Sequence, residues 1–222
     1  MAEFTLVIGN RNYSSWSLRA WLALAATGVD YDEIVIPLRQ ANTTENILRH
    51  SPSGKVPALR HGETVIWDSL AIAEYLAEHV PDAGLWPSGI EARAVARAVS
   101  AEMHAGFVAL RRNMPMNIRA GAAKTAPELD DDVRSDVNRI EAIWRDCRQR
   151  FGGDGELLFG GFTIADAMYA PMASRFRTFG IALEDTGQAY LEAVLGHPLM
   201  VEWTNAARNE TWIIPEFELN SD

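Results

Sequence analysis

Two short segments of the sequence carry groups that could bind a small peptide. Val56 and Pro57 stand where a short strand begins, a position that tolerates proline although it has no amide hydrogen to pair. A cis bond between them would turn the amide and carbonyl of Val56 outward, ready to pair with an extended peptide. Asp68 and Ser69 open an apolar helix, where backbone amides and the helix dipole favour a bound carboxylate. Such a site suits a short peptide that has a free carboxylate and an ammonium group at one end.

Glutathione is a peptide of that kind, and a third segment could activate its thiol. A thiol has a pKa of about 8.5, so only a few per cent is thiolate near neutral pH. A donating hydroxyl and a helix N-terminus both favour the ionised sulfur, and Ser14–Ser15–Trp16–Ser17 lies between the first strand and the first helix. The alternative interpretation is that Ser15 or Ser17 is a helix N-cap and nothing more.

These segments together resemble the cytosolic glutathione transferases. Val56–Pro57 and the segment 68–76 resemble the glutathione-binding half of that family, and Thr163–Asp166 resembles the capping motif of its second domain. The resemblance implies a thioredoxin-like first domain and an all-helical second domain. It also implies that the Val56 backbone pairs with the cysteinyl part of glutathione, that a cis Pro57 shapes this contact, and that Asp68 and Ser69 hold the γ-glutamyl end.

The segment 14–19 resembles the Ser-Ser-Cys-Ser-x-Arg signature of the zeta class, whose members isomerise maleylacetoacetate. In that class the first serine activates the thiol, which corresponds to Ser14 here. Related classes place the serine one residue nearer the arginine, so Ser15 remains an alternative and Tyr13 ranks third. Trp16 replaces the signature cysteine, and this departure weakens the isomerase interpretation without affecting glutathione binding.

A second group of residues could contact the substrates. A cation at Lys55 could pair with the glycyl carboxylate of glutathione, although a solvated turn lysine is equally plausible. The electrophile is expected between the first helix and the second domain. Arginine in this region would favour an acidic substrate, whereas aromatic residues at helical spacing are more often plain core. The predicted substrate pocket consists of Trp16, His104, Phe107, Arg111 and Arg175.

Apolar and turn residues predict two domains. Residues 1–80 alternate strands and helices in the order β-α-β-α-β-β-α, which is that of thioredoxin-like folds. Residues 81–89 form a linker rich in proline and glycine, and residues 90–222 predict an all-α domain. Its first helix is expected over residues 92–110. Thr163 and Asp166 predict a capping box before a later apolar helix, with no catalytic part for Asp166.

Composition limits the possible functions and locations. A net charge of −10 with no basic stretch argues against nucleic-acid binding, and no apolar run approaches the length of a membrane span. One cysteine, Cys147, suits a reducing compartment, and with no secretory pattern at residues 1–9 we expect a cytoplasmic protein. Five scattered histidines show no metal-site spacing, so no metal is expected. The resemblance implies glutathione as the co-substrate.

We therefore predict a serine-type glutathione transferase that acts on a small electrophile, and a homodimer as is typical of the family. A non-catalytic scaffold of the same family that binds glutathione or other ligands is the rival interpretation. A disulfide reductase of the same fold would need a cysteine at the helix start, and Cys147 is far from it in sequence. The sequence does not identify the electrophile, nor does it distinguish conjugation from isomerisation.

Overall fold

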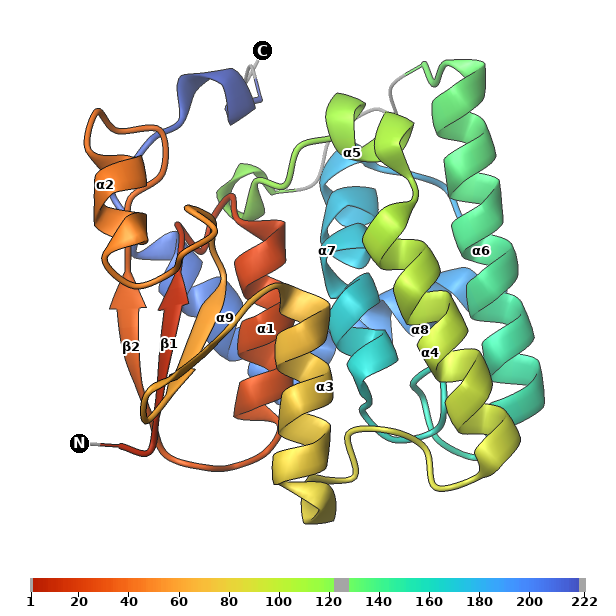
Figure 1. Cartoon of the computed structure of the whole chain (residues 1–222). Helices are drawn as coiled ribbons and strands as arrows, with labels where there is room; N and C mark the ends of the chain where they lie inside the picture. Colours follow the sequence, from red (N-terminus) through yellow and green to blue (C-terminus); the bar gives the residue numbers. More distant parts are fainter. Residues whose placement is uncertain (1, 122–127, 220–222) are drawn as a thin grey trace.

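The computed structural model of the protein describes residues 2–121 and 128–219. A four-stranded sheet and helices α1–α3 occupy the first part of the chain, and the rest of the described chain is helical (Figure 1). The strands and α-helices are β1 (Phe4–Ile8), α1 (Ser15–Ala25), β2 (Tyr31–Val35), α2 (Thr43–Leu48), β3 (Ala58–His61), β4 (Thr64–Ile66), α3 (Ser69–His79), α4 (Ile90–Ala105), α5 (Val108–Asn113), α6 (Asp131–Phe151), α7 (Ile164–Phe179), α8 (Asp185–Gly196) and α9 (Pro198–Arg208).

The sheet has the order β2-β1-β3-β4, with β2 parallel to β1 and the other neighbouring pairs antiparallel. The parallel pair needs a crossover connection, which α1 supplies. Helices α1 and α3 pack together beside one face of the sheet (Figure 1). Helix α2 contributes Ile47 to a separate small core cluster with Val7 and Ala58. This order agrees with the predicted first domain. The division at residues 81–89 stays a prediction.

Helix α7 is the centre of the second part of the chain and is buried along nearly its whole length. It packs against α1, α4 and α8, so it joins the helical part to the first helix of the α/β part. Arg19 crosses this contact, with its Nε donating to the carbonyl of Met168 on α7 at 2.9 Å. This hydrogen bond therefore fastens α1 to α7. No helix of the described residues is long and apolar enough to cross a membrane.

The first helix of the second domain is shorter than the sequence predicts. It ends at Ala105 rather than continuing to residue 110, and a separate α5 begins at Val108. The break falls at Gly106 and Phe107, with Phe107 in the left-handed region at φ 56°. A Cβ at residue 106 would lie 2.8 Å from the carbonyl oxygen of Glu102, so this close approach requires glycine.

The capping box at the start of α7 is present as predicted. The Asp166 carboxylate accepts from the Thr163 amide at 2.8 Å and the Leu158 amide at 3.1 Å. The Thr163 hydroxyl at 2.9 Å and the Tyr190 hydroxyl at 3.2 Å also donate to it. Burial nevertheless raises the pKa of Asp166 to about 6, because these hydrogen bonds offset the loss of water only in part. Asp166 therefore holds the loop before α7 and α8 to the start of α7.

The raised pKa of Asp166 gives a test of this buried cap. Because the folded protein holds the Asp166 proton up to a higher pH than the unfolded chain, the group stabilises the fold at low pH. That contribution is lost as the pH rises through about 6. We expect the free energy of unfolding of the native protein to gain about 1 kcal/mol over that of Asp166→Asn between pH 7 and pH 5. Urea unfolding of both proteins at each pH measures this gap, and a gap that stays constant would contradict the assignment.

Candidate active site

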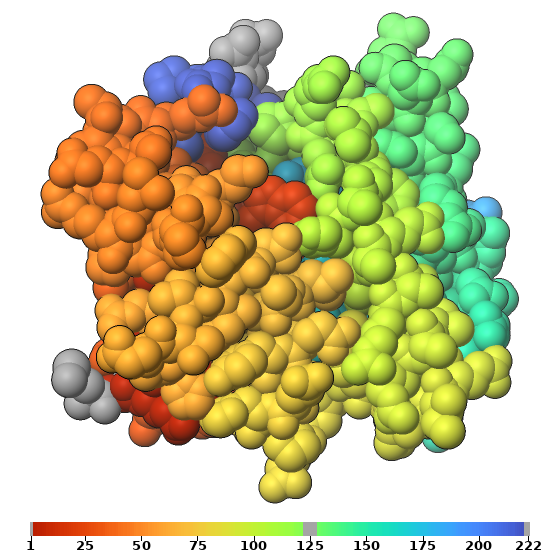
Figure 2. All heavy atoms as spheres, in the orientation of Figure 1, coloured from red at the N-terminus to blue at the C-terminus, as the bar shows by residue number. Residues whose placement is uncertain are grey.

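A surface pocket of about 390 Å³ lies where the loop before β3 and the start of α3 face α1 and α4. Figure 2 shows the hollow on this face: the red N-terminal part of the chain is exposed between the orange segment and lime-green α4 and α5. Most of its lining was predicted from the sequence as binding or substrate residues. These predicted residues are Trp16, Lys55, Val56, Pro57, Asp68, Ser69 and His104.

The start of α3 forms one wall of the pocket. Asp68 is the N-cap of α3, and its Oδ1 accepts from the amide of Leu70 at 3.1 Å. Ser69 follows as the first helical residue and is 1% exposed. Its hydroxyl makes no hydrogen bond within the described part of the chain, although it belongs to the pocket wall. A buried hydroxyl without a partner costs free energy, so Ser69 is a group that a ligand could satisfy.

The loop before β3 forms the facing wall. The Val56–Pro57 bond is cis, and the pairing of β3 with β1 begins only at Ala58. The backbone of Val56 therefore lies outside the sheet ladder and beside the pocket. Lys55 lines the same wall and adds a cation. This wall thus offers backbone groups and a positive charge opposite the carboxylate of Asp68.

Trp16 separates the pocket from the contact between α1 and the helical domain. The edge of its ring meets the ring of His104 at a centroid distance of 5.2 Å. The guanidinium of Arg19 lies 4.6 Å from the ring centroid, and that of Arg111 lies 5.2 Å away. Cations over an indole face are favourable and hold the ring in place. His104 links Trp16 to the start of α3, because its Nε2 lies 3.1 Å from Oδ2 of Asp68.

The two candidate serines make different hydrogen bonds at the start of α1. Ser14 is the N-cap: its hydroxyl donates to Oγ of Ser17 at 2.8 Å and accepts from the Ser17 amide at 3.3 Å. Ser15 is the first helical residue, and its Oγ accepts from Nη2 of Arg175 at 3.3 Å. Both side chains are buried and neither belongs to the pocket wall. The N-cap predicted at Ser15 or Ser17 is thus Ser14.

Two buried arginines surround Ser15. Besides bonding its hydroxyl, Arg175 donates to the carbonyls of Met114 and Pro171, while Nη1 of Arg19 donates to the carbonyl of Ser15 at 3.1 Å. Burial lowers the pKa of Arg175 to about 9, with a further contribution from Arg111, and it lowers the pKa of Arg19 as well. In the described residues, no carboxylate oxygen lies within 4 Å of either guanidinium. The start of α1 thus has two uncompensated positive charges behind it.

Several predicted residues lie outside the pocket wall. Arg175 is buried beneath Ser15 and Phe107 packs in the core, whereas Arg111 reaches Trp16 from behind. The Tyr13 hydroxyl is engaged elsewhere: it donates to Glu218 and accepts from Nη2 of Arg119 at 2.7 Å. The residues that the sequence interpretation missed are Ser53 and Trp67, both in the pocket wall. Their positions in the sequence, close to Lys55 and Asp68, could have identified them as pocket residues.

Cys147 is not part of the pocket wall, and its thiol is unreactive. It lies in α6, 1% exposed, and burial raises the pKa of its thiol to about 12. A thiol with so high a pKa has almost no thiolate near neutral pH. This agrees with the low rank of a disulfide reductase.

Comparison with known proteins agrees with the geometry of the pocket. Residues 13–79 match the family model of the glutathione S-transferase N-terminal domain. Maleylacetoacetate isomerase of Rattus norvegicus is 28% identical over 176 residues, which are 78% of each chain. A zeta-class glutathione S-transferase of Euphorbia esula is 40% identical over 83 residues, 37% of each chain. Over residues 13–79 the chain is therefore similar to the glutathione S-transferase family.

The fold comparison covers nearly the whole chain. A glutathione transferase homolog from Burkholderia gl BGR1, solved with bound glutathione, superposes with a TM-score of 0.70 at 22% identity, covering 93% of this chain and 98% of that one. The predicted fold class, a thioredoxin-like α/β domain followed by an all-α domain, is confirmed. The zeta-like resemblance is confirmed as well, because the relatives include zeta-class members.

Proposed function

We propose that the protein binds glutathione in the pocket between α3, the loop before β3 and α1, and joins the glutathione sulfur to a small electrophile. The observation that carries this proposal is the buried hydroxyl of Ser69, which lacks a partner in the described structure and belongs to a residue of the pocket wall. The same pocket carries a carboxylate at Asp68 and a cation at Lys55. A tripeptide with one ammonium and two carboxylate groups complements this distribution of charge.

Each group of the tripeptide has a proposed partner. The γ-glutamyl ammonium pairs with Asp68, and the neighbouring carboxylate accepts from the Ser69 hydroxyl at the positive end of the α3 dipole. The cysteinyl backbone pairs with Val56 in an extended conformation, with Pro57 completing the wall. The glycyl carboxylate forms an ion pair with Lys55, and the Ser53 hydroxyl lies in the same wall and can donate to it. The sulfur is then directed toward α1.

We assign Ser14 as the group that activates the sulfur, with Ser15 as the alternative. Ser14 caps α1, so its hydroxyl lies at the positive end of the helix dipole. Its present bond to Ser17 is a neutral one, and a charge-assisted bond to a thiolate is about twice as strong. The positive charges of Arg19 and Arg175 behind the helix start also favour an anionic sulfur.

The reaction we propose is conjugation. The thiol gives its proton to solvent, the thiolate attacks an electrophilic carbon, a sulfur–carbon bond forms, and the leaving group departs with its electron pair. Trp16, Trp67 and His104 provide flat aromatic walls, which suits a planar electrophile. An aryl halide activated by nitro groups is therefore a suitable first probe, with initial rates of conjugation as the readout.

Isomerisation is the second candidate, favoured by the similarity to maleylacetoacetate isomerase. There the thiolate adds to a cis double bond, the single bond so formed rotates, and elimination returns the thiolate and a trans product. Trp16 occupies the position of the signature cysteine and carries two cations over its ring. Rates with a cis-unsaturated diketo acid, measured beside the aryl halide, separate the two reactions. The homodimer and the cytoplasmic location also stay predictions.

Replacing Ser69 by alanine tests the proposed binding site. We expect glutathione to bind about tenfold more weakly, because the lost hydrogen bond is worth about 1 kcal/mol or slightly more. Isothermal titration calorimetry measures the dissociation constant. The matched control is Ser100→Ala: its hydroxyl is also buried and unpartnered in the described structure, but it lies in α4 outside the pocket wall. Equal weakening in both variants, or in neither, would contradict the proposal.

Replacing Ser14 by alanine tests the activation of the sulfur. We expect the pKa of bound glutathione to rise by about 1–2 units, because a hydrogen bond to a charged group is worth about 1.5–3 kcal/mol. Glutathione affinity should change little. The ultraviolet absorbance of the thiolate, followed against pH, reports the pKa, and Ser15→Ala serves as the neighbouring control. A rise in Ser15→Ala instead would move the role by one residue, and a rise in neither would exclude serine activation.

A further inference from the structure

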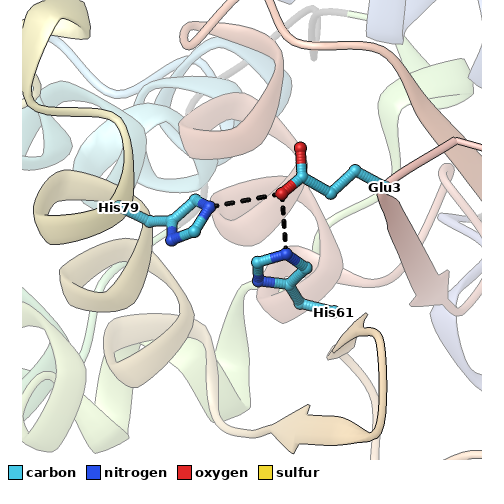
Figure 3. Close-up of side chains that lie close together, drawn as sticks. All are labelled: Glu3, His61 and His79. Atoms are coloured by element: carbon cyan, nitrogen blue, oxygen red, sulfur yellow. Dashed lines mark hydrogen bonds and ion pairs between the residues drawn. The ribbon is translucent and has the colours of Figure 1, made fainter.

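Three side chains with metal-ligating atoms converge at the end of α3 remote from the pocket. They are Glu3 before β1, His61 at the end of β3 and His79 at the end of α3 (Figure 3). Oε1 of Glu3 lies 2.8 Å from Nε2 of His61 and 3.4 Å from Nε2 of His79. Because α3 begins at Ser69 and rises about 1.5 Å per residue, the length of the helix separates this cluster from the pocket.

The set of donor atoms suits Zn²⁺. Imidazole nitrogen and carboxylate oxygen are both ligands that zinc, a borderline-soft ion, binds in tetrahedral sites. At bond lengths of about 2.0–2.1 Å, neighbouring tetrahedral ligands lie about 3.3 Å apart. The two nitrogen–oxygen separations of the cluster, 2.8 Å and 3.4 Å, fall on either side of that value. All three ligating atoms lie within 4.8 Å of one another, so modest side-chain shifts would bring them around an ion, and water would supply the fourth ligand.

The surroundings of the two histidines orient them as metal ligands. Nδ1 of His61 lies 2.6 Å from the hydroxyl of Tyr75, a contact that fixes the ring and lets Nδ1–H donate while Nε2 ligates. The ring of Tyr75 stacks on His79 at a centroid distance of 5.6 Å and an angle of 9°. Phe4 supports His61 at 4.6 Å. One tyrosine thus positions both imidazoles, one by its hydroxyl and one by its ring.

We propose that Glu3, His61 and His79 bind one Zn²⁺ ion, which fastens the start of β1, the end of β3 and the end of α3 together. The net charge of −10 favours accumulation of cations around the protein. This proposal opposes the expectation of no metal, which rested on the scattered histidines of the sequence. The site is independent of the glutathione pocket, so its failure would leave the proposed function untouched.

The test uses the full chain without an affinity tag, stripped of metal with a chelator. Co²⁺ serves as the first probe, because its visible absorption reports ligand number and geometry, and Zn²⁺ is then titrated by calorimetry. We expect one ion per chain at micromolar Zn²⁺ and a rise in Tm of several degrees. Absence of one-to-one binding, or Zn²⁺ that binds without raising Tm, would overturn the proposal.

Variants assign the ligands. His79→Gln and Glu3→Gln change exposed side chains, so both should fold, and each should weaken Zn²⁺ binding at least tenfold. Tyr75→Phe keeps the ring but removes the hydroxyl, and should weaken binding by about 10- to 100-fold. His197→Asn, at the N-cap of α9, is the control and should bind Zn²⁺ like the native protein. Unchanged binding in His79→Gln, or equal loss in His197→Asn, would overturn the assignment.

Discussion

The contact between α1 and α7 is the constraint on which the candidate active site depends. Helix α1 begins at the pocket, and its first turn is fixed by the guanidiniums of Arg19 and Arg175, which bond both backbone and side chain of Ser15. Helix α7 can serve as the fixed partner because it is buried and capped by Asp166. The capping box at the start of α7 therefore supports the helix against which α1 packs.

The same contact has an electrostatic cost. Two buried cations without carboxylate partners in the described structure repel one another, and desolvation lowers the pKa of each. Backbone carbonyls and the Ser15 oxygen compensate only in part, because dipoles replace water but add no negative charge. An anion at the start of α1 would complete the compensation. If the proposed thiolate occupies that place, its stabilisation and the relief of the two arginines are the same interaction.

Local signals in the sequence were sufficient for much of the site. A proline at a strand start and an Asp-Ser pair at a helix start can be recognised from the neighbouring residues alone. The pocket wall contains both. The orientation of Arg175 could not be derived in this way, because helical spacing gives its face but not which neighbour covers that face. The break at Phe107 depends on the close approach of Gly106 to Glu102, which is a tertiary constraint. Glu3, His61 and His79 are far apart in sequence, so only folding reveals that they meet.

Helix α3 carries the proposed glutathione site at its first residue and the proposed zinc site at its last, about 15 Å apart along its axis. Coupling between two sites needs two states of the protein that both ligands distinguish. A single packed helix with its core residues Ile72 and Leu76 fully buried offers one state, not two. Zinc would therefore raise the stability of the α/β domain as a whole while leaving the affinity for glutathione unchanged. The two ends of α3 can therefore bind different ligands independently, because its packed middle does not transmit the effect of one ligand to the other site.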